Sequence, residues 1–300
     1  MPDFPKTVPE LANNLDVLAQ ELSFLAGSVE HAIKLKKLPK PNGEERTITV
    51  PSQRLKAFLS RLDSAVLRQV PLHPLLYHRP GSSYIEMIRQ HRRSRCLITA
   101  DIDDFYPSVT RSKVFRALLS QGFEQSVAKI ITRLTTVFHS LPQGFPTSPT
   151  IAGIVLRPVA IRLEGLVGAC RLRIGIYADN LAISANYDAT KFETLIKRIF
   201  LQSGYKLDKW RVMMPSQRQE IMNIVVSNGM SVKAEYRNEV RRDILILSKL
   251  KESQQSGEFS SKLASLRGKL NHIYNINPSQ FNSLGKYARR LGVDVWRDDS

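Results

Sequence analysis

The sequence predicts an α+β protein, and three observations lead to this prediction. Two apolar, strand-forming runs, at 97–109 and 172–184, each carry an aspartate where a strand is expected to end. Helical patterns at 111–123 and 150–163 lie between these runs, and Pro158 is expected to interrupt the second helix. Strands and helices in this order pack as two layers and bring both acidic strand ends to one sheet.

A strongly basic composition predicts a polyanionic partner. The 300 residues include 44 Lys and Arg against 27 Asp and Glu, a formal net charge of +17. The two cysteines, Cys96 and Cys170, lie far apart with no clustered histidines, which excludes a zinc ribbon and a disulfide scaffold. No apolar run approaches the roughly 18 residues of a spanning helix, and the first residues lack a signal-peptide pattern. We therefore expect a cytoplasmic protein with no membrane partner.

Residues 1–33 predict one amphipathic helix. Apolar side chains recur there at alternating intervals of four and three residues, as on one helix face. These residues are Leu11, Leu15, Leu18, Leu22, Leu25 and Val29. The face could bind a partner helix and so support a homo- or hetero-oligomer. Fewer than about three heptads, however, favour docking on the protein's own body.

Residues 34–95 hold the densest positive charge, with 14 basic side chains against four acidic ones. Within this segment, Asn42-Gly43 predicts a two-residue hairpin turn, and 47–50 predicts the return strand. Lys40 and Arg46 flank the hairpin. Their charges are therefore candidates to close over a triphosphate.

Three carboxylates follow one another where the first strand ends. Strand alternation puts Asp101 and Asp103 on one face and Asp104 on the other. Like charges this close together are costly unless a cation neutralises them. Thr110 then predicts the N-cap of the helix over 111–123.

The second strand-forming run predicts a hairpin with Asp179 at its tip. Apolar strands flank Ala178-Asp179-Asn180 on both sides. A single Asp in a hairpin turn is ordinarily only turn chemistry. This motif does not stand alone, because Asp101 ends a strand of the same predicted sheet.

Four short motifs follow one another along the chain: DIDDFYPSV (101–109), LPQGFPTSP (141–149), YADN (177–180) and GYKLDKWRV (204–212). In this order they resemble motif A, motif B, the Tyr-Ala-Asp-Asp hairpin and motif D of the retron-type bacterial reverse transcriptases. Further segments resemble the family's fingers motif, the stretch after motif D and the thumb: 40–56, 218–244 and 263–278. The resemblance covers almost the whole chain.

The resemblance implies a right-hand polymerase fold, with fingers, a palm that contains an antiparallel sheet, and a helical thumb. After the N-terminal helix of 1–33, the fingers would occupy the basic segment 34–95. The palm would occupy 96–245, with part of the fingers interleaved. The thumb would occupy 246–300.

The same resemblance implies a metal site. Asp101, Asp179 and the backbone carbonyl of Ile102 would bind two Mg²⁺ ions. Asn180 stands where the family has a second Asp and is counted with the catalytic residues. Because this replacement removes one negative charge, we expect reduced activity or a preference for Mn²⁺.

Further residues are carried over from the family to nucleotide and nucleic-acid binding. The residues that would contact the incoming dNTP are Lys40, Arg46, Tyr106, Gln143, Gly144 and Arg211. Tyr106 occupies the position that crowds a ribose 2′-hydroxyl, and Gly144 lets the backbone approach closely. Arg211 stands where motif D usually has a lysine. The residues that would contact nucleic acid are Arg79, His91, Arg267 and Lys269.

The implied function is an RNA-directed DNA polymerase that makes cDNA from a dedicated noncoding RNA. By resemblance it would act in bacterial anti-phage defence, together with an effector protein of the same system. One alternative is a weak or inactive, polymerase-like RNA-binding scaffold that controls such a partner. Another is untemplated DNA synthesis on the same fold. Retention of Asp101, Asp179, Gln143 and Lys40 favours the templated enzyme.

Overall fold

A computed structural model of the chain describes residues 4–39, 43, 45–78, 82–252 and 256–293. Both helices and strands occur throughout the described residues, so the predicted α+β class is confirmed. The chain divides into two compact units. The first unit comprises Met1–Tyr84, Thr99–Ile183 and Ala189–Arg211, and the second comprises Ile85–Ile98, Ser184–Asp188 and Val212–Ser300.

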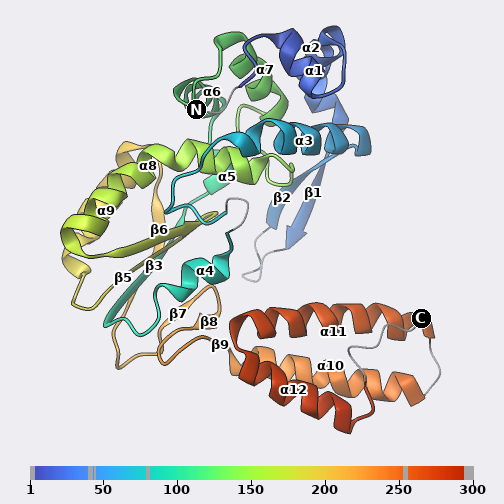
Figure 1. Ribbon diagram of the computed structural model, residues 1–300, viewed down its shortest axis with the longest axis vertical. Helices are drawn as coiled ribbons and strands as arrows, with labels where there is room; N and C mark the ends of the chain where they lie inside the picture. Colours follow the sequence, from blue (N-terminus) through green and yellow to red (C-terminus); the bar gives the residue numbers. More distant parts are fainter. Residues whose placement is uncertain (1–3, 40–42, 44, 79–81, 253–255, 294–300) are drawn as a thin grey trace. The chain divides into compact units, whose positions relative to one another are not determined.

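Figure 1 labels the elements in chain order. The α-helices are α1 (Val8–Asn14), α2 (Ala19–Ser28), α3 (Gln53–Ala65), α4 (Tyr84–Arg89), α5 (Phe105–Ser108), α6 (Arg111–Ser120), α7 (Gln125–Thr135), α8 (Ser148–Cys170), α9 (Glu193–Gln202), α10 (Ala234–Glu252), α11 (Ser256–Ile276) and α12 (Pro278–Arg290). Short 3-10 helices are η1 (Val29–Ala32), η2 (Leu67–Gln69) and η3 (Thr190–Phe192). The strands are β1 (Ile33–Pro39), β2 (Glu45–Pro51), β3 (Cys96–Ile102), β4 (Arg173–Tyr177), β5 (Asn180–Ala185), β6 (Leu207–Met213), β7 (Glu220–Ile221), β8 (Ile224–Val225) and β9 (Ser231–Val232).

The N-terminal segment folds as two helices, so the single helix predicted for 1–33 is wrong. Asp16 takes a left-handed φ of 55°, which turns the chain between α1 and α2. Leu11 and Leu15 are fully buried, and both α1 and α2 pack against α7. Leu18 belongs to the same predicted stripe but lies at the N-cap of α2 and is exposed. Most of the stripe therefore docks on the protein's own helices.

β1 and β2 form the predicted antiparallel hairpin. Their pairing runs from Ile33 opposite Pro51 to Pro39 opposite Glu45. The two-residue turn predicted at Asn42-Gly43 stays a prediction, because Asn42 lies outside the described residues.

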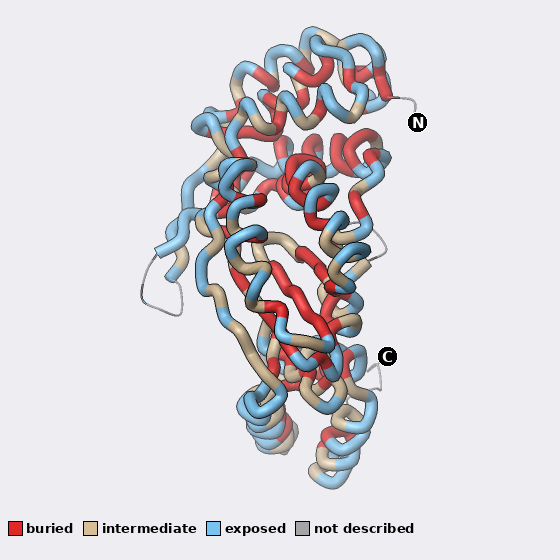
Figure 2. The backbone as a smooth tube through the Cα atoms, turned by 90° about the vertical axis from the view of Figure 1, so that its left-hand side faces the viewer, coloured by how far each residue is buried: buried red, intermediate tan, exposed pale blue. Residues whose placement is uncertain are grey.

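The central sheet has the strand order β4-β5-β3-β6. Nearly all of β5 and most of β3 and β4 are buried, as the red segments of Figure 2 show. In the first unit, α8 packs against β4 and α9 (Figure 1). α8 continues through Pro158, so the predicted interruption is wrong. Pro158 is exposed, and water can bind the carbonyl that loses its N–H donor there.

The C-terminal part of the second unit is a group of three helices that contact one another, α10, α11 and α12 (Figure 1). Lys269 on α11 forms ion pairs with Glu239 and Asp243 of α10, at 2.6 and 2.7 Å. The predicted boundary between palm and thumb, after residue 245, falls inside α10. A helical thumb would therefore begin near Ala234, and the rest of the division into fingers, palm and thumb stays a prediction.

Candidate active site

Two aspartates from separate strands meet at one end of the central sheet. Asp101 is the second-last residue of β3, and Asp179 lies in the tip of the β4–β5 hairpin. The backbone N–H of Ile102 donates a hydrogen bond to the backbone oxygen of Asp179 at 2.8 Å. Because β3 and β5 are neighbours in the sheet, this bond holds the two aspartates side by side. The structure thus brings together the pair predicted from sequence.

The hairpin tip keeps Asp179 partly buried. Ala178 has a left-handed φ of 52°, which allows a tip of only two residues between β4 and β5. Burial raises the pKa of the Asp179 carboxyl, and the Asp101 carboxylate raises it further, while hydrogen bonds and Lys209 oppose these effects. A cation bound between the carboxylates would remove their repulsion.

Lys209 provides a positive charge at this pair. Its Nζ lies 2.9 Å from Oδ2 of Asp101, and this hydrogen bond raises the pKa of the lysine. Lys209 has a φ of 48° within β6, a left-handed conformation that is uncommon for a side chain with a Cβ. Sequence reasoning missed this residue and assigned the motif D cation to Arg211. In the described part of the chain, Arg211 is exposed and makes no ion pair.

The other two carboxylates of the acidic run lie outside the strand. We predicted that strand alternation puts Asp103 on the same face as Asp101. This prediction is wrong, because β3 ends at Ile102 and Asp103 lies outside the strand. The N–H of Asp103 instead donates to the backbone oxygen of Lys206 at 2.9 Å, and the two side chains are 3.6 Å apart. Asp104 has a φ of 40° before α5 and is exposed.

Asn180 directly contacts the aspartate beside it. Its side-chain Nδ2 donates a hydrogen bond to Oδ1 of Asp179 at 2.8 Å. The amide therefore occupies an acceptor position that the carboxylate could otherwise offer to a metal. A second Asp at this position would accept hydrogen bonds only and would leave Oδ1 open.

Tyr106 is a residue of α5 and lies near the aspartate pair. Burial raises the pKa of its hydroxyl, and the nearby charges of Asp179 and Tyr177 raise it further. The ring of Phe105 packs against the Tyr106 ring with centroids 5.5 Å apart. A half-buried aromatic ring therefore lies near Asp179, and its role in excluding a 2′-hydroxyl stays a prediction.

The Gln143-Gly144 loop is attached to the β1–β2 hairpin. The N–H of Thr49 in β2 donates to the backbone oxygen of Gln143 at 2.8 Å. Gly144 has a φ of +123°, and a Cβ there would lie 2.5 Å from the backbone oxygen of Thr49. The close contact with β2 therefore requires glycine at this position. This requirement is independent of the predicted contact with a nucleotide. The exposed Arg46 lies on the same strand.

The remaining predicted residues have different outcomes. Lys40 and Arg79 lie outside the described residues. His91 is fully buried, with Nδ1 2.8 Å from Oγ of Ser184, so its predicted contact with nucleic acid is wrong. Lys269 forms ion pairs with two carboxylates of α10, and its predicted contact with nucleic acid stays a prediction. Arg267 is half-buried on α11, and its prediction stays open.

The donors at the aspartate pair suit hard divalent cations. Carboxylate and carbonyl oxygens are the ligands that Mg²⁺ and Mn²⁺ prefer. Within the described ranges, no group of three or more His, Cys, Asp or Glu side chains could hold a metal ion. Asp101, Asp179 and the Ile102 carbonyl therefore fit ions whose remaining ligands come from water or from substrate oxygens.

The fold and the acidic strand ends define a polymerase of the right-hand class. The chain is similar in structure to a telomerase from Candida albicans solved with a fragment of telomeric RNA. The TM-score is 0.51 at 9% identity, over 86% of this chain and 63% of that chain. The Reverse transcriptase (RNA-dependent DNA polymerase) family matches residues 38–235. The chain belongs to this family, which is the family that the sequence motifs predicted.

Two curated relatives support the retron type. The Retron Mx65 reverse transcriptase of Myxococcus xanthus is 26% identical over 280 residues, which are 85% of this chain and 64% of that protein. The Retron Ec86 reverse transcriptase of Escherichia coli is 24% identical over 257 residues, 84% of this chain and 78% of that protein. The chain thus spans less than two thirds of the Mx65 protein. Among the residues that the structure describes, no helix is long and apolar enough to span a membrane.

Proposed function

We propose that the chain copies a dedicated noncoding RNA into cDNA, with dNTPs as substrates, at the site formed by Asp101 and Asp179. The observation that carries this proposal is the hydrogen bond from Ile102 to Asp179, because it holds together two aspartates that are far apart in sequence. The similarity to retron reverse transcriptases of two bacteria supports the substrate class. A place in bacterial anti-phage defence, in the cytoplasm and with an effector partner, belongs to the same proposal.

Each residue at the site has a proposed role. Asp101, Asp179 and the Ile102 carbonyl hold two divalent ions, which when bound lower the pKa of the primer 3′-hydroxyl and neutralise the leaving pyrophosphate. Tyr106 restricts the sugar to deoxyribose. Gln143 and Gly144 support the nucleotide, and Arg46 on the hairpin faces its phosphates.

Primer extension on an RNA template tests the proposal. The wild-type protein is compared with Asp101→Asn and Asp179→Asn, in Mg²⁺ and in Mn²⁺. We expect each variant to lose at least about 100-fold in rate, the range seen when one group that stabilises the reacting charge is removed. Asp104→Asn is the matched control, because it removes a charge from the same acidic run and Asn readily adopts the left-handed φ of 40° found there. Extension that survives both aspartate variants would contradict the proposal.

The products distinguish the two alternatives. A polymerase-like scaffold is favoured by Asn180, which removes one carboxylate and covers Oδ1 of Asp179. A scaffold would bind RNA and extend no primer in either metal. An untemplated enzyme would extend primers, but its DNA would contain repeats or random tracts. The proposed enzyme makes DNA complementary to the RNA that purifies with it from cells.

A further inference from the structure

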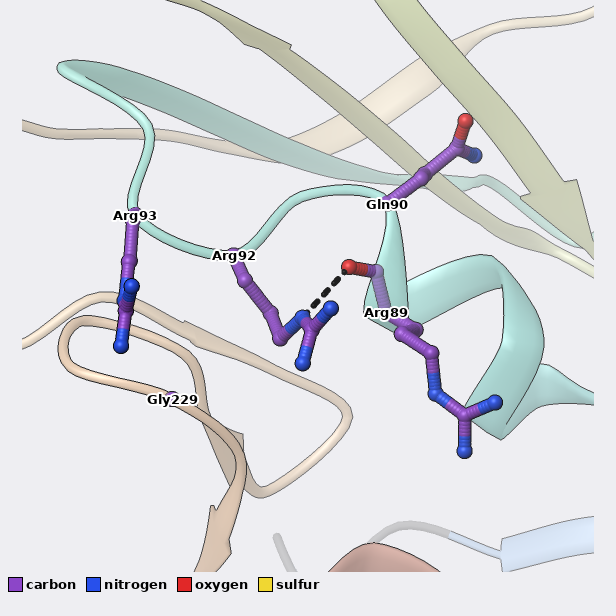
Figure 3. A pocket seen from close by; sticks show the side chains of 5 residues that line it. All are labelled: Arg89, Gln90, Arg92, Arg93 and Gly229. Carbon is purple, nitrogen blue, oxygen red and sulfur yellow. Dashed lines mark hydrogen bonds between the residues drawn. The ribbon is translucent and has the colours of Figure 1, made fainter.

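The second unit contains a pocket with a basic lining. The residues that line it are Arg89, Gln90, Arg92, Arg93 and Gly229, and its volume is about 430 Å³. Figure 3 shows the three guanidinium groups on the side of the turn that faces the Gly229 loop, whereas Gln90 points the other way. The lining, all of it from the described residues, includes no acidic side chain and no aromatic ring.

The three arginines are not neutralised by carboxylates. Across the described ranges, Arg89, Arg92 and Arg93 form no ion pair. One side-chain hydrogen bond occurs among them, from Nε–H of Arg92 to the backbone oxygen of Arg89 at 3.1 Å (Figure 3). Three cations at one pocket repel one another, and a bound anion would relieve that repulsion.

Hydrogen bonds hold the arginine-bearing turn in place. The N–H of Arg93 donates to the backbone oxygen of Val226, at 3.2 Å, on the segment that leads to Gly229. Gln219 Nε2 donates to the backbone oxygen of Ser94 at 2.9 Å, and Ser94 Oγ donates to the backbone oxygen of His91 at 2.8 Å. His91 and Ser94 are both buried. The backbone of the turn is therefore held in place before any ligand binds, which reduces the entropy lost on binding.

We propose that Arg89, Arg92 and Arg93 form a phosphate-binding pocket that takes the backbone of the RNA. Guanidinium groups bind phosphate oxygens in bidentate fashion. Because no aromatic ring lines the pocket, it offers no platform for stacking of bases, and recognition is of phosphates and not of sequence. The choice of RNA as the source of the phosphates rests on the proposed function. The aspartate pair belongs to the first unit, so the pocket is a site of its own.

Salt-dependent RNA binding tests this inference. The affinity of the full-length chain for a labelled single-stranded RNA of about 30 nucleotides is measured by fluorescence anisotropy, from about 50 to 300 mM salt. The pocket variant carries Arg89→Gln, Arg92→Gln and Arg93→Gln. The control variant carries three substitutions on exposed faces of α6, α7 and α9: Arg116→Gln, Arg133→Gln and Arg198→Gln. Both variants lose the same total charge, so a difference between them reports position.

We expect the pocket variant to bind RNA at least about 10-fold more weakly near 150 mM salt, with the control within about 2-fold of wild type. The slope of log affinity against log salt is negative, and its magnitude should decrease by about 2. The reason is that each lost phosphate contact removes roughly 0.7 from that magnitude for a single strand. Two RNAs of different sequence should be affected equally. If the two triple variants bind RNA equally well, the inference is wrong.

Inorganic phosphate separates RNA from a small anion as the occupant. If phosphate stabilises the wild-type protein against heat but not the pocket variant, and RNA affinity is unchanged, the pocket binds a small anion and the inference is overturned. A third variant with Arg→Lys at the three positions keeps the charge of the pocket. We expect it to bind RNA more tightly than the Arg→Gln pocket variant, which would show that the loss of affinity comes from the lost charge and not from misfolding. If Asp179→Asn leaves cDNA synthesis intact while the pocket variant loses RNA, the proposed function fails and the inference stands.

Discussion

Nζ of Lys209 lies 2.9 Å from Oδ2 of Asp101, so this carboxylate near the end of β3 already has a cation beside it. The lysine side chain is 63% exposed and reaches Asp101 from a backbone with a φ of 48°. Because one carboxylate oxygen cannot fully serve both an ammonium and a metal ion, Lys209 and the metal compete for Asp101.

Removal of this competing lysine should strengthen metal binding. For Lys209→Gln we expect the Mn²⁺ concentration at half-saturation, measured by electron paramagnetic resonance, to fall by about 3- to 10-fold. The Mg²⁺ requirement of primer extension should fall in parallel. Lys206→Gln is the control, because Lys206 is paired with Asp103 at 3.6 Å. Weaker metal binding in Lys209→Gln would show that the lysine supports the metal and does not compete with it.

Asn180→Asp should lower the metal requirement of extension. The change adds a carboxylate and removes the amide donor that lies 2.8 Å from Oδ1 of Asp179. Because charge on the ligands tunes affinity for divalent ions, we expect half-saturation at roughly 5- to 10-fold less Mg²⁺. The ratio of the extension rate in Mn²⁺ to the rate in Mg²⁺ should also be smaller for the variant than for the wild type. Mg²⁺ titrations of the two proteins that superimpose would refute this explanation.

Gly144→Ala should destabilise the fold and abolish extension. Its Cβ would lie 2.5 Å from the backbone oxygen of Thr49, at a φ of +123° that side chains rarely adopt. We expect a loss of about 2–4 kcal/mol in the free energy of unfolding, measured with urea. Gly165→Ala on the exposed face of α8 is the control, because nothing lies within 4 Å of its new Cβ. That variant should gain roughly 0.5–1 kcal/mol, and equal effects in both would contradict the account.

His78 should make the protein less stable in acid. Both of its ring nitrogens are buried and make no hydrogen bond to the described residues, and burial lowers the pKa of the ring to about 4 from an unfolded value of 6.5. Between these values the unfolded chain binds a proton that the folded chain does not. The free energy of unfolding should therefore fall by up to about 3 kcal/mol as the pH drops from 6.5 to 4, and His78 should contribute no further loss below pH 4.

Urea unfolding between pH 4 and pH 7 measures this effect. His78→Leu should flatten the pH dependence, because leucine does not titrate. His31→Leu alters an exposed histidine and should keep the wild-type dependence. If the His78→Leu and wild-type curves are parallel, the buried ring is not the cause.

Features that depend on short stretches of sequence were predictable. Thr110 accepts a hydrogen bond from the N–H of Lys113 at 3.3 Å and caps α6, as its position before a helical pattern predicted. The strand end at Asp101 and the hairpin tip at Asp179 were also readable, because each follows an apolar run. Resemblance to a family then showed that the two belong together.

Features that depend on packing were not predictable. Lys209 and Arg211 are two residues apart on one strand, so strand alternation gives no reason to choose between them, and the φ of 48° at Lys209 has no sequence signal. His91 lies among arginines in the sequence, and only the fold shows that it is buried. The neighbouring arginines are the exposed ones, and they line the pocket that single-residue reasoning did not find.

Incorporation of a single nucleotide tests the central claim most directly. A DNA primer is annealed to an RNA template, and each of the four dNTPs is offered alone with Mg²⁺ or Mn²⁺ to the wild-type protein and to Asp179→Asn. We predict that the wild type adds only the dNTP complementary to the template base and that Asp179→Asn loses this addition by at least about 100-fold. Addition of all four dNTPs alike, or addition that survives in Asp179→Asn, would contradict templated synthesis at the aspartate pair.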